Sequence, residues 1–454
     1  MIHKKHIINL IVVLECMLLV AMPINAKIID SKSIYTEDIS QKTNDAIDKI
    51  HEHYSDITEL VTIGQSAKEQ TDIKAIRLGK GEKYILINGA HHGRESLTAI
   101  LTLDQLQYLA EAYSQNKTID GYDVRSLLNT VSIWFVPMTN PDGADIAMST
   151  SPSWKANGNG VDLNKNYPTL YAQNKSAKQP GPIGYSGPYP FSEPETQALY
   201  EMCEKYNFES AIAYHSAGEV IYWWYYQTDK VYDDSLYLAK GLSKTTGYAL
   251  MPISESKGGL GFTDWFIQVY NRPGFTLEIG KTVNGKPLKW QEYGVIWEKN
   301  KNIPLQLTQE IIKMKTSQTD ILVEGQSIKG QKVFDTTMVP VKDFANIFNL
   351  SYSYDSVDKS ITLKDLEKRI TFWVGEKEIV HNGEVIQLPV PAYISNGTSY
   401  IPLDPVLEIF FGLKEPDIPF EETEIPMEEQ IDESLEEDNF LEDDSFLEEM
   451  NLSF

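Results

Sequence analysis

The chain has 454 residues, of which 42% are hydrophobic, and its formal net charge is −25. This length and composition exclude a fully disordered chain and predict two or three folding units. The charge is uneven, because the segment from Phe411 to Phe454 holds 17 acidic residues and one Lys. Neither this tail nor the mildly acidic body is suited to neutralising phosphates, so nucleic acid is not an expected partner.

The first 26 residues have the pattern of a signal peptide. A basic start precedes an apolar run, and Ala26 stands at a plausible cleavage point. The alternative is an uncleaved membrane anchor, but Glu15 within the run weakens a spanning helix. Cleavage would leave Cys203 as the single cysteine, which excludes an intramolecular disulfide. Export without disulfides is typical of bacteria, so we expect a secreted or cell-wall-associated bacterial protein.

The next segments alternate between helices and short apolar strands. The polar stretch from residue 27 to about residue 70 contains a predicted helix with Ile47, Ile50 and Tyr54 on one face, and residues 97–112 also look helical. Four apolar strands each end on residues capable of chemistry: YILINGAHHGRE, VSIWFVPMTNPDG, ESAIAYHS and RPGFTLEIG. This alternation predicts an α/β domain, in which ligands bind where strand ends open into loops.

The composition changes after about residue 315. From Ile321 to Leu413 the apolar residues alternate with period two, which predicts a small β-rich domain. We therefore expect the first large domain at residues 27–316, the β-rich domain at 317–413 and a disordered acidic tail at 414–454. The tail either solubilises the protein or presents its scattered apolar residues to a partner.

A metal site is the first chemical hypothesis. His92 and Glu95 stand three residues apart as the chain leaves a strand, and both are residue types that bind zinc. The pair alone is a weak signal and needs a distant third ligand, for which His215 is the natural choice. His91 would point the other way if the segment is extended.

Groups that could act on a substrate come from two further segments. Glu278 lies in a strongly apolar strand, where burial of its carboxyl would favour a role as general base, although a salt-bridged core Glu is the alternative. Lys155, Asn164 and Lys165 lie in the polar segment WKANGNGVDLNKNYP. They could stabilise an oxyanion and hold a carboxylate, or they could belong to an ordinary polar loop.

These motifs, in their order along the chain, resemble those of the carboxypeptidase A family of zinc metallopeptidases. The resemblance covers the chain from about Tyr35 to Lys313. The resemblance implies a mixed central sheet flanked by helices and one zinc ion per chain, held by His92 and Glu95 of HGRE and by His215. It implies that Glu278 is the general base.

The substrate-binding positions depart from the family pattern. Lys155 stands where the family has the Arg that polarises the scissile carbonyl. Asn164 and Lys165 stand where the family has an Asn-Arg pair that binds the terminal carboxylate of the substrate. Lys lacks the planar fork of Arg, so the swaps are not neutral. Ser256 stands where a capping Tyr is usual, and Thr263 takes the position that lines the specificity pocket.

Within the family, WKAN, FSEPETQAL, YHSAGEVIYWWY and RPGFTLEIG resemble bacterial γ-D-glutamyl-diaminopimelate peptidases, which cut peptidoglycan stem peptides. The β-rich region, with VPVKDFANIF and NGTSYIPLDPV, resembles the copper amine oxidase N-terminal-like stalk domain, which implies cell-wall attachment or spacing and no copper chemistry. Three functions remain open: a cell-wall peptidase, a nutritional carboxypeptidase acting on ordinary peptides, and a non-catalytic wall-binding module.

Overall fold

The computed structural model describes residues 27–169, 177–253, 261–281, 286–323, 325–381 and 384–413. The expected signal peptide, the acidic tail and Ser256 lie outside these ranges. Among the described residues, no helix combines the length and the apolar character needed to cross a bilayer.

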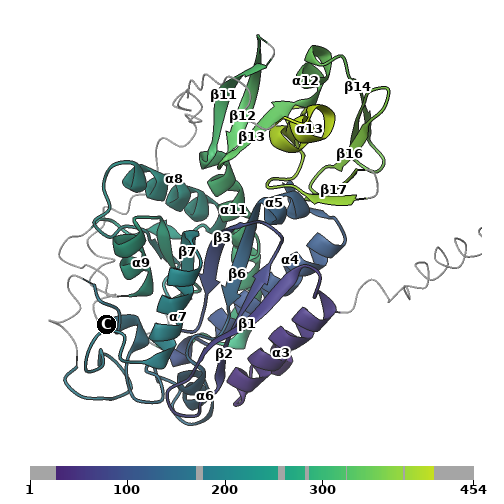
Figure 1. The fold of residues 1–454 in the computed structure, drawn as a ribbon. Helices are drawn as coiled ribbons and strands as arrows, with labels where there is room; N and C mark the ends of the chain where they lie inside the picture. Colours follow the sequence, from purple (N-terminus) through teal and green to yellow (C-terminus); the bar gives the residue numbers. More distant parts are fainter. Residues whose placement is uncertain are drawn as a thin grey trace, which may run out of the picture.

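An eight-stranded sheet forms the centre of the N-terminal part of the molecule (Figure 1), in the order β1-β2-β6-β3-β7-β10-β8-β9. Its strands are β1 (Thr58–Gln65), β2 (Asp72–Leu78), β3 (Lys83–Asn88), β6 (Val131–Val136), β7 (Phe208–His215), β8 (Val220–Tyr222), β9 (Ala249–Leu250) and β10 (Gly274–Glu278). Neighbouring strands pair in parallel from β6 through β3 and β7 to β10. Three pairs are antiparallel: β1 with β2, β2 with β6, and β8 with β10. The predicted mixed central sheet is therefore confirmed.

The central strands are apolar runs because both of their faces are covered. Every residue of β6 and of β7 is buried. Along β3, Ile85 and Ile87 enter the core on one face of the sheet, whereas Leu86 enters the core on the other. This alternation follows from the two-residue period of a strand.

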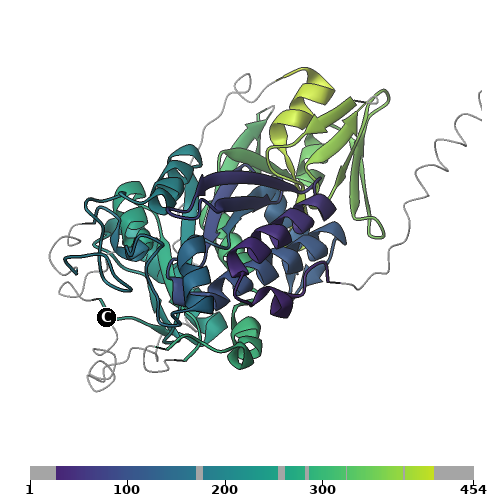
Figure 2. The ribbon, with the colours of Figure 1, turned by 90° about the horizontal axis from the view of Figure 1, so that it is seen from below.

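Helices cover both faces of the sheet (Figures 1 and 2). One face carries α3 (Ile39–His53), α4 (Leu97–Ser114), α5 (Val124–Thr130), α8 (Asp229–Thr246), α10 (Tyr293–Asn300) and α11 (Ile303–Met314), and the other carries α7 (Pro194–Lys205) and α9 (Phe262–Tyr270). The remaining small elements are α2 (Ser31–Ile34), α6 (Pro141–Ser149), β4 (Thr118–Ile119) and β5 (Tyr122–Asp123). The two predicted helices correspond to α3 and α4, and Ile47 and Ile50 are buried as their spacing predicted.

The C-terminal part is β-rich, as predicted, and has its own apolar core. One five-stranded sheet has the order β11-β12-β13-β20-β19 and the other the order β14-β15-β16-β17-β18. The elements are β11 (Thr316–Val323), β12 (Gln326–Val333), β13 (Thr336–Pro340), α12 (Val341–Ile347), β14 (Ser351–Asp355), β15 (Ser360–Lys364), β16 (Arg369–Trp373), β17 (Glu378–His381), β18 (Glu384–Gln387), β19 (Tyr393–Ser395), β20 (Thr398–Pro402) and α13 (Leu403–Phe411).

The C-terminal part contacts the edge of the central sheet at which β3 begins (Figure 1). The Lys83 ammonium, at the first residue of β3, lies 2.9 Å from the Asp335 carboxylate. The turn after β16 packs on α5, where the Asn129 amide donates to the Gly375 carbonyl at 2.6 Å. Gly375 has a φ of +85°, a conformation that glycine adopts without strain. Because parallel strands run away from this edge, the C-terminal part leaves their carboxyl ends uncovered.

We predict that Asn129→Ala lowers the free energy of unfolding by about 1–3 kcal/mol, because the change leaves buried polar partners without a hydrogen bond. Asn129 is fully buried, and it also accepts a hydrogen bond from the Tyr113 hydroxyl. Urea denaturation followed by tryptophan fluorescence would measure the loss, with Asn346→Ala on the exposed side of α12 as the control. Equal effects of the two changes would contradict a stabilising contact between the two parts.

Candidate metal centre

Three neighbouring strands deliver the predicted chemical residues to one edge of the sheet. β7 ends at His215 and β10 ends at Glu278, and these two residues lie directly opposite each other in the parallel register. β3 pairs with the other side of β7, and the chain that leaves β3 carries His92 and then Glu95 in a short 3₁₀ turn. Parallel pairing therefore brings residues that are far apart in sequence to a common place.

The structure brings His92, Glu95 and His215 into mutual contact. The Nδ1 atoms of the two histidines are 3.3 Å apart, and the Glu95 carboxylate oxygens lie 2.8 Å from His92 Nδ1 and 3.0 Å from His215 Nδ1. All three side chains are buried, and within the described residues they form a group that could hold a metal ion.

The donor set fits zinc. Ligands held at 2.0–2.1 Å around a tetrahedral zinc ion are separated by roughly 3.3 Å, and the ligand atoms here show similar spacings. Two ring nitrogens that face each other at this distance, beside a carboxylate, are better suited to binding a shared metal cation than to carrying a proton on each nitrogen. Two His and one Glu are also a donor set found in catalytic zinc sites, which leave a coordination position open for water.

Asp162 supports His92 from the other side of its ring. An Asp162 carboxylate oxygen lies 3.1 Å from His92 Nε2, so a proton on Nε2 would leave the Nδ1 lone pair directed at the metal position. Burial alone would raise the pKa of Asp162, but the interaction with His92, followed by the charges of Lys155 and Lys165, outweighs burial and lowers that pKa. Sequence reasoning did not single out Asp162, although it stands directly before Leu163 and Asn164 in the DLNKN motif.

The Asn-Pro-Asp-Gly turn holds the metal-binding loop. The Asn140 amide donates to the carbonyls of His91, at 3.0 Å, and Ala156, at 3.1 Å, while its oxygen accepts from Gly143 N–H at 2.9 Å. A Cβ atom on Gly93 would lie 2.1 Å from the Gly143 carbonyl oxygen, so only glycine fits there. The sequence predicted a turn at this position, and the structure shows that it joins two loops of the site.

His91 is not one of the three converging residues, as the sequence predicted, but its ring does not turn away from the centre. It stacks on the ring of His215 with centroids 5.5 Å apart. Its Nε2 lies 3.1 Å from the hydroxyl of the buried Tyr167. The sequence gives no signal of this contact, because it depends on how two loops meet.

Glu278 and Lys155 lie beside the metal centre. Burial raises the pKa of Glu278, and the nearby Glu95 carboxylate raises it further, whereas the Lys155 charge lowers it. Lys155 is buried, but among the described residues no oxygen pairs with its ammonium. A carboxyl with a raised pKa and an unpaired cation are therefore available to a reacting group.

Asn164 and Thr263 lie at the start of α9, and Lys165 follows Asn164 in the chain. The Asn164 side-chain oxygen accepts a hydrogen bond from Phe262 N–H at 3.0 Å, and within the described ranges its amide NH₂ has no acceptor. Lys165 acts on the same Asp162 carboxylate that holds His92, and its positive charge lowers the pKa of that carboxyl. The Thr263 hydroxyl contacts the Thr276 hydroxyl at 2.6 Å. The structure thus gathers these predicted residues near the metal centre without testing their roles.

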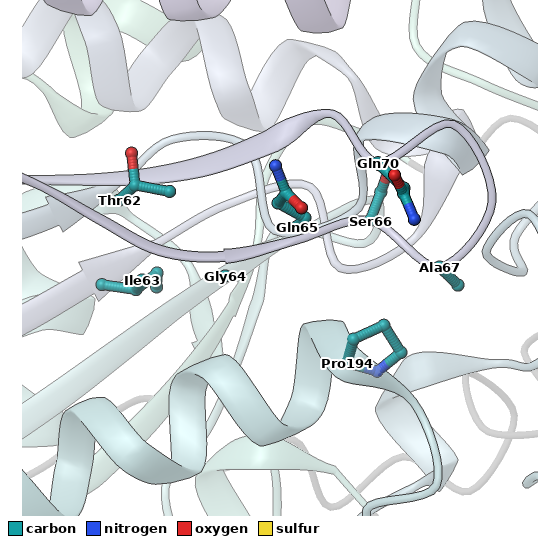
Figure 3. Close-up of a pocket in the computed structure, with 8 residues that line it drawn as sticks. All are labelled: Thr62, Ile63, Gly64, Gln65, Ser66, Ala67, Gln70 and Pro194. Carbon is teal, nitrogen blue, oxygen red and sulfur yellow. The ribbon is translucent and has the colours of Figure 1, made fainter.

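A separate pocket lies along the edge strand β1 (Figure 3), far across the sheet from β7 and β10. It is lined by Thr62, Ile63, Gly64, Gln65, Ser66, Ala67, Gln70 and Pro194. These residues are all uncharged and none was predicted to act in chemistry, so we assign no role in catalysis to this pocket.

We predict that Asp162→Ala weakens zinc binding by about 10- to 100-fold, because His92 loses the carboxylate that orients its ring. Competition with a chromogenic chelator would measure the affinity. Asp320→Ala, which removes a carboxylate paired with Lys329 in the C-terminal part, is the matched control. A folded Asp162→Ala protein with unchanged affinity would rule out this orienting role.

Comparison with known proteins agrees with the fold. Residues 43–258 match the zinc carboxypeptidase family model, and residues 330–414 match that of the copper amine oxidase N-terminal domain. The structure is similar to that of bovine thrombin-activatable fibrinolysis inhibitor, with a TM-score of 0.53 and 21% identity, over 60% of this chain and 97% of that one. At this identity the likeness shows the fold alone.

Two bacterial relatives match over about half of the chain. The γ-D-glutamyl-L-diamino acid endopeptidase 1 of Lysinibacillus sphaericus is 31% identical over 258 residues, which are 52% of this chain and 63% of the relative. The uncharacterized protein YqgT of Bacillus subtilis is 29% identical over 243 residues, or 49% of this chain and 64% of the relative. The chain thus covers less than two thirds of either relative. It contains a domain of the zinc carboxypeptidase family, followed by a copper amine oxidase N-terminal domain.

Proposed function

We propose that this protein is an exported zinc carboxypeptidase that cuts the bond between γ-D-Glu and diaminopimelate in peptidoglycan stem peptides. The observation that carries the proposal is the convergence of His92, Glu95 and His215 next to Glu278 at the carboxyl edge of the sheet. The relative from Lysinibacillus sphaericus, whose name specifies a γ-D-glutamyl-L-diamino acid bond, supports this choice of substrate.

The chain provides a group for each step of peptide hydrolysis. Zinc held by His92, Glu95 and His215 would supply Lewis-acid activation of water and of the scissile carbonyl. The Glu278 carboxylate takes a proton from the attacking water and delivers it to the leaving amine. Its raised pKa, caused first by burial, brings it closer to the range that both transfers require.

The cations next to the centre have separate roles in the proposal. The Lys155 ammonium, unpaired among the described residues, stabilises the negative charge that develops on the carbonyl oxygen. The Asn164 amide and the Lys165 ammonium hold the carboxylate of the leaving residue, so cleavage occurs next to a free C-terminus. Export would rest on residues 1–26, and the C-terminal part would attach the enzyme to the cell wall or space it from the wall.

The first test compares hydrolysis of L-Ala-γ-D-Glu-diaminopimelate with hydrolysis of ordinary tripeptides by the zinc-loaded protein. We expect cleavage of the wall peptide, loss of activity with a chelator, and a fall of about 10²- to 10⁴-fold in kcat for Glu278→Gln with zinc still bound. Glu310→Gln on α11 controls for the loss of a carboxylate elsewhere. Activity on ordinary peptides alone would favour a nutritional enzyme, and inactivity on both would favour a wall-binding module.

A second test concerns the carboxylate of the substrate. We expect Lys165→Ala to raise KM by about tenfold with a smaller change in kcat, since a charge-assisted hydrogen bond is lost. Lys165→Arg should retain binding, because its guanidinium offers the same charge in a planar fork. A substrate with an amidated C-terminus should bind the parent and Lys165→Ala proteins equally poorly. An unchanged KM in Lys165→Ala would remove Lys165 from the substrate site.

A further inference from the structure

Two glutamates that have no part in the proposed mechanism are buried side by side at the start of α7. Glu195 is fully buried, and Glu193 is 4% exposed. The side-chain amide of Asn157 donates to a carboxylate oxygen of each, at 2.8 Å for Glu193 and 3.1 Å for Glu195. Two oxygens that accept from one NH₂ group are close neighbours, so the two carboxyl groups share a single buried site.

Burial and like charge keep a proton on this pair. Within the described ranges, no Lys, Arg or His forms an ion pair with either carboxyl. Burial raises the pKa of Glu195 to about 7, and the negative charge of Glu193 raises it too, against the hydrogen bonds from Ala67 N–H and Asn157. The Tyr167 phenol, which also faces Glu195, is uncharged because burial raises its pKa. Glu195 therefore gains or loses its proton near neutral pH while the protein is folded.

The loop that follows β1 brings no cation to this pair. Its Ala67 N–H donates to Glu195 at 2.9 Å, and its Lys68 N–H donates at 2.9 Å to Asp142, a third buried carboxylate. The side chains of Lys68 and Glu69 are exposed. The loop thus offers Glu195 an N–H donor and no neutralising charge, while Asp142 on its other side adds a further negative group.

The pocket along β1 lies next to the pair (Figure 3). Two of its lining residues are Ala67, which is hydrogen-bonded to Glu195, and Pro194, which separates the two glutamates in the chain. A small displacement of the surrounding loops therefore gives the proton of Glu195 a route to solvent.

Asn157 connects the two glutamates to the proposed catalytic groups. Its side-chain oxygen accepts from Asn159 N–H and Val161 N–H, both at 3.0 Å, and its own N–H donates to the Val161 carbonyl at 2.8 Å. One side chain thus closes a tight turn, which lies between Lys155 on one side and Asp162 on the other.

The segment that precedes this turn is bonded to the metal-binding loop. Gly93 N–H donates to the Lys155 carbonyl at 3.1 Å, and Arg94 N–H donates to the Trp154 carbonyl at 2.8 Å. The Trp154 indole N–H in turn donates to the Asn157 carbonyl at 3.2 Å. A displacement of Asn157 therefore moves the main chain that holds Lys155 against the metal-binding loop.

We propose that Glu195 is a positioning residue whose protonated carboxyl, together with Glu193, holds Asn157 and the turn that Asn157 closes. Loss of the proton leaves two negative charges around one amide, so the pair separates, the turn opens and Lys155 is displaced. The effect on catalysis rests on the proposed peptidase function, whereas the effect on the turn does not. Hydrolysis then falls on the alkaline side of neutral pH, although Glu278 stays ionised there.

Hydrogen exchange tests the turn without a substrate. The stabilisation by protonated Glu195 is present at acidic pH and is lost as the pH rises through about 7, so opening should become about tenfold more favourable between pH 6 and pH 8. In the zinc-loaded parent protein, amides of residues 157–161 should therefore lose about tenfold of their protection, after correction for the intrinsic exchange rate. Mass spectrometry of peptides that cover the turn would measure this loss.

Glu195→Gln should keep its protection at pH 8, because Gln has the shape of the protonated carboxyl and cannot ionise. Glu193→Gln removes the neighbouring charge and should act in the same direction, which provides a second variant if the first does not fold. The matched control is Glu209→Gln, at a buried carboxylate of β7 that lies near Arg272 and Lys315. It should lose protection as the parent protein does.

The pH profile of wall-peptide hydrolysis tests the effect on Lys155. We expect kcat/KM of the parent protein to fall about tenfold from pH 7 to pH 9, and that of Glu195→Gln to stay level over this range. Unchanged protection of the parent turn between pH 6 and pH 8, or an equal loss in Glu195→Gln, would overturn the inference. An alkaline fall in kcat/KM shared by both proteins would overturn the link to Lys155. The expected exchange result in a protein that cleaves no peptide would support the proton-dependent turn and reject the proposed function.

Discussion

The parallel pairing of β3, β7 and β10 is the constraint on which the candidate site depends. Strands that run in the same direction end at the same edge, so residues that follow β3 meet residues that close β7 and β10. The register places His215 directly opposite Glu278, and the chain leaving β3 adds His92 and Glu95. Because β7 is buried along its whole length, a shift of its register by one residue would move each of its side chains to the opposite apolar core.

A second set of contacts holds the residues at these strand ends in fixed positions. Asp162 fixes the ring of His92, while Asn140 joins the loop of His91 to the loop of Ala156. Gly93 allows these loops to approach more closely than a side chain would permit. The ligand atoms are therefore held by buried hydrogen bonds that come from separate segments, an arrangement that keeps a metal site preorganised.

Two cations lie close to the candidate metal centre. Lys155 and Lys165 lie on the side of Asp162 and His92, where a carbonyl oxygen and a terminal carboxylate would lie. The described C-terminal part packs at the other edge of the sheet, through Lys83 and Asn129.

The sequence alone determined the α/β class, the β-rich C-terminal part and the residues that converge on the candidate metal centre, because buried parallel strands are continuous apolar runs and the chemical residues stand at their ends. The HGRE, ESAIAYHS and FTLEIG segments indicated these residues, through their order and their resemblance to one family. Only the tertiary structure decided that Asp162 supports His92 and that Asn140 joins two loops of the site. Those relations depend on which loops pack together, and no local pattern encodes a contact between segments that are distant in the chain.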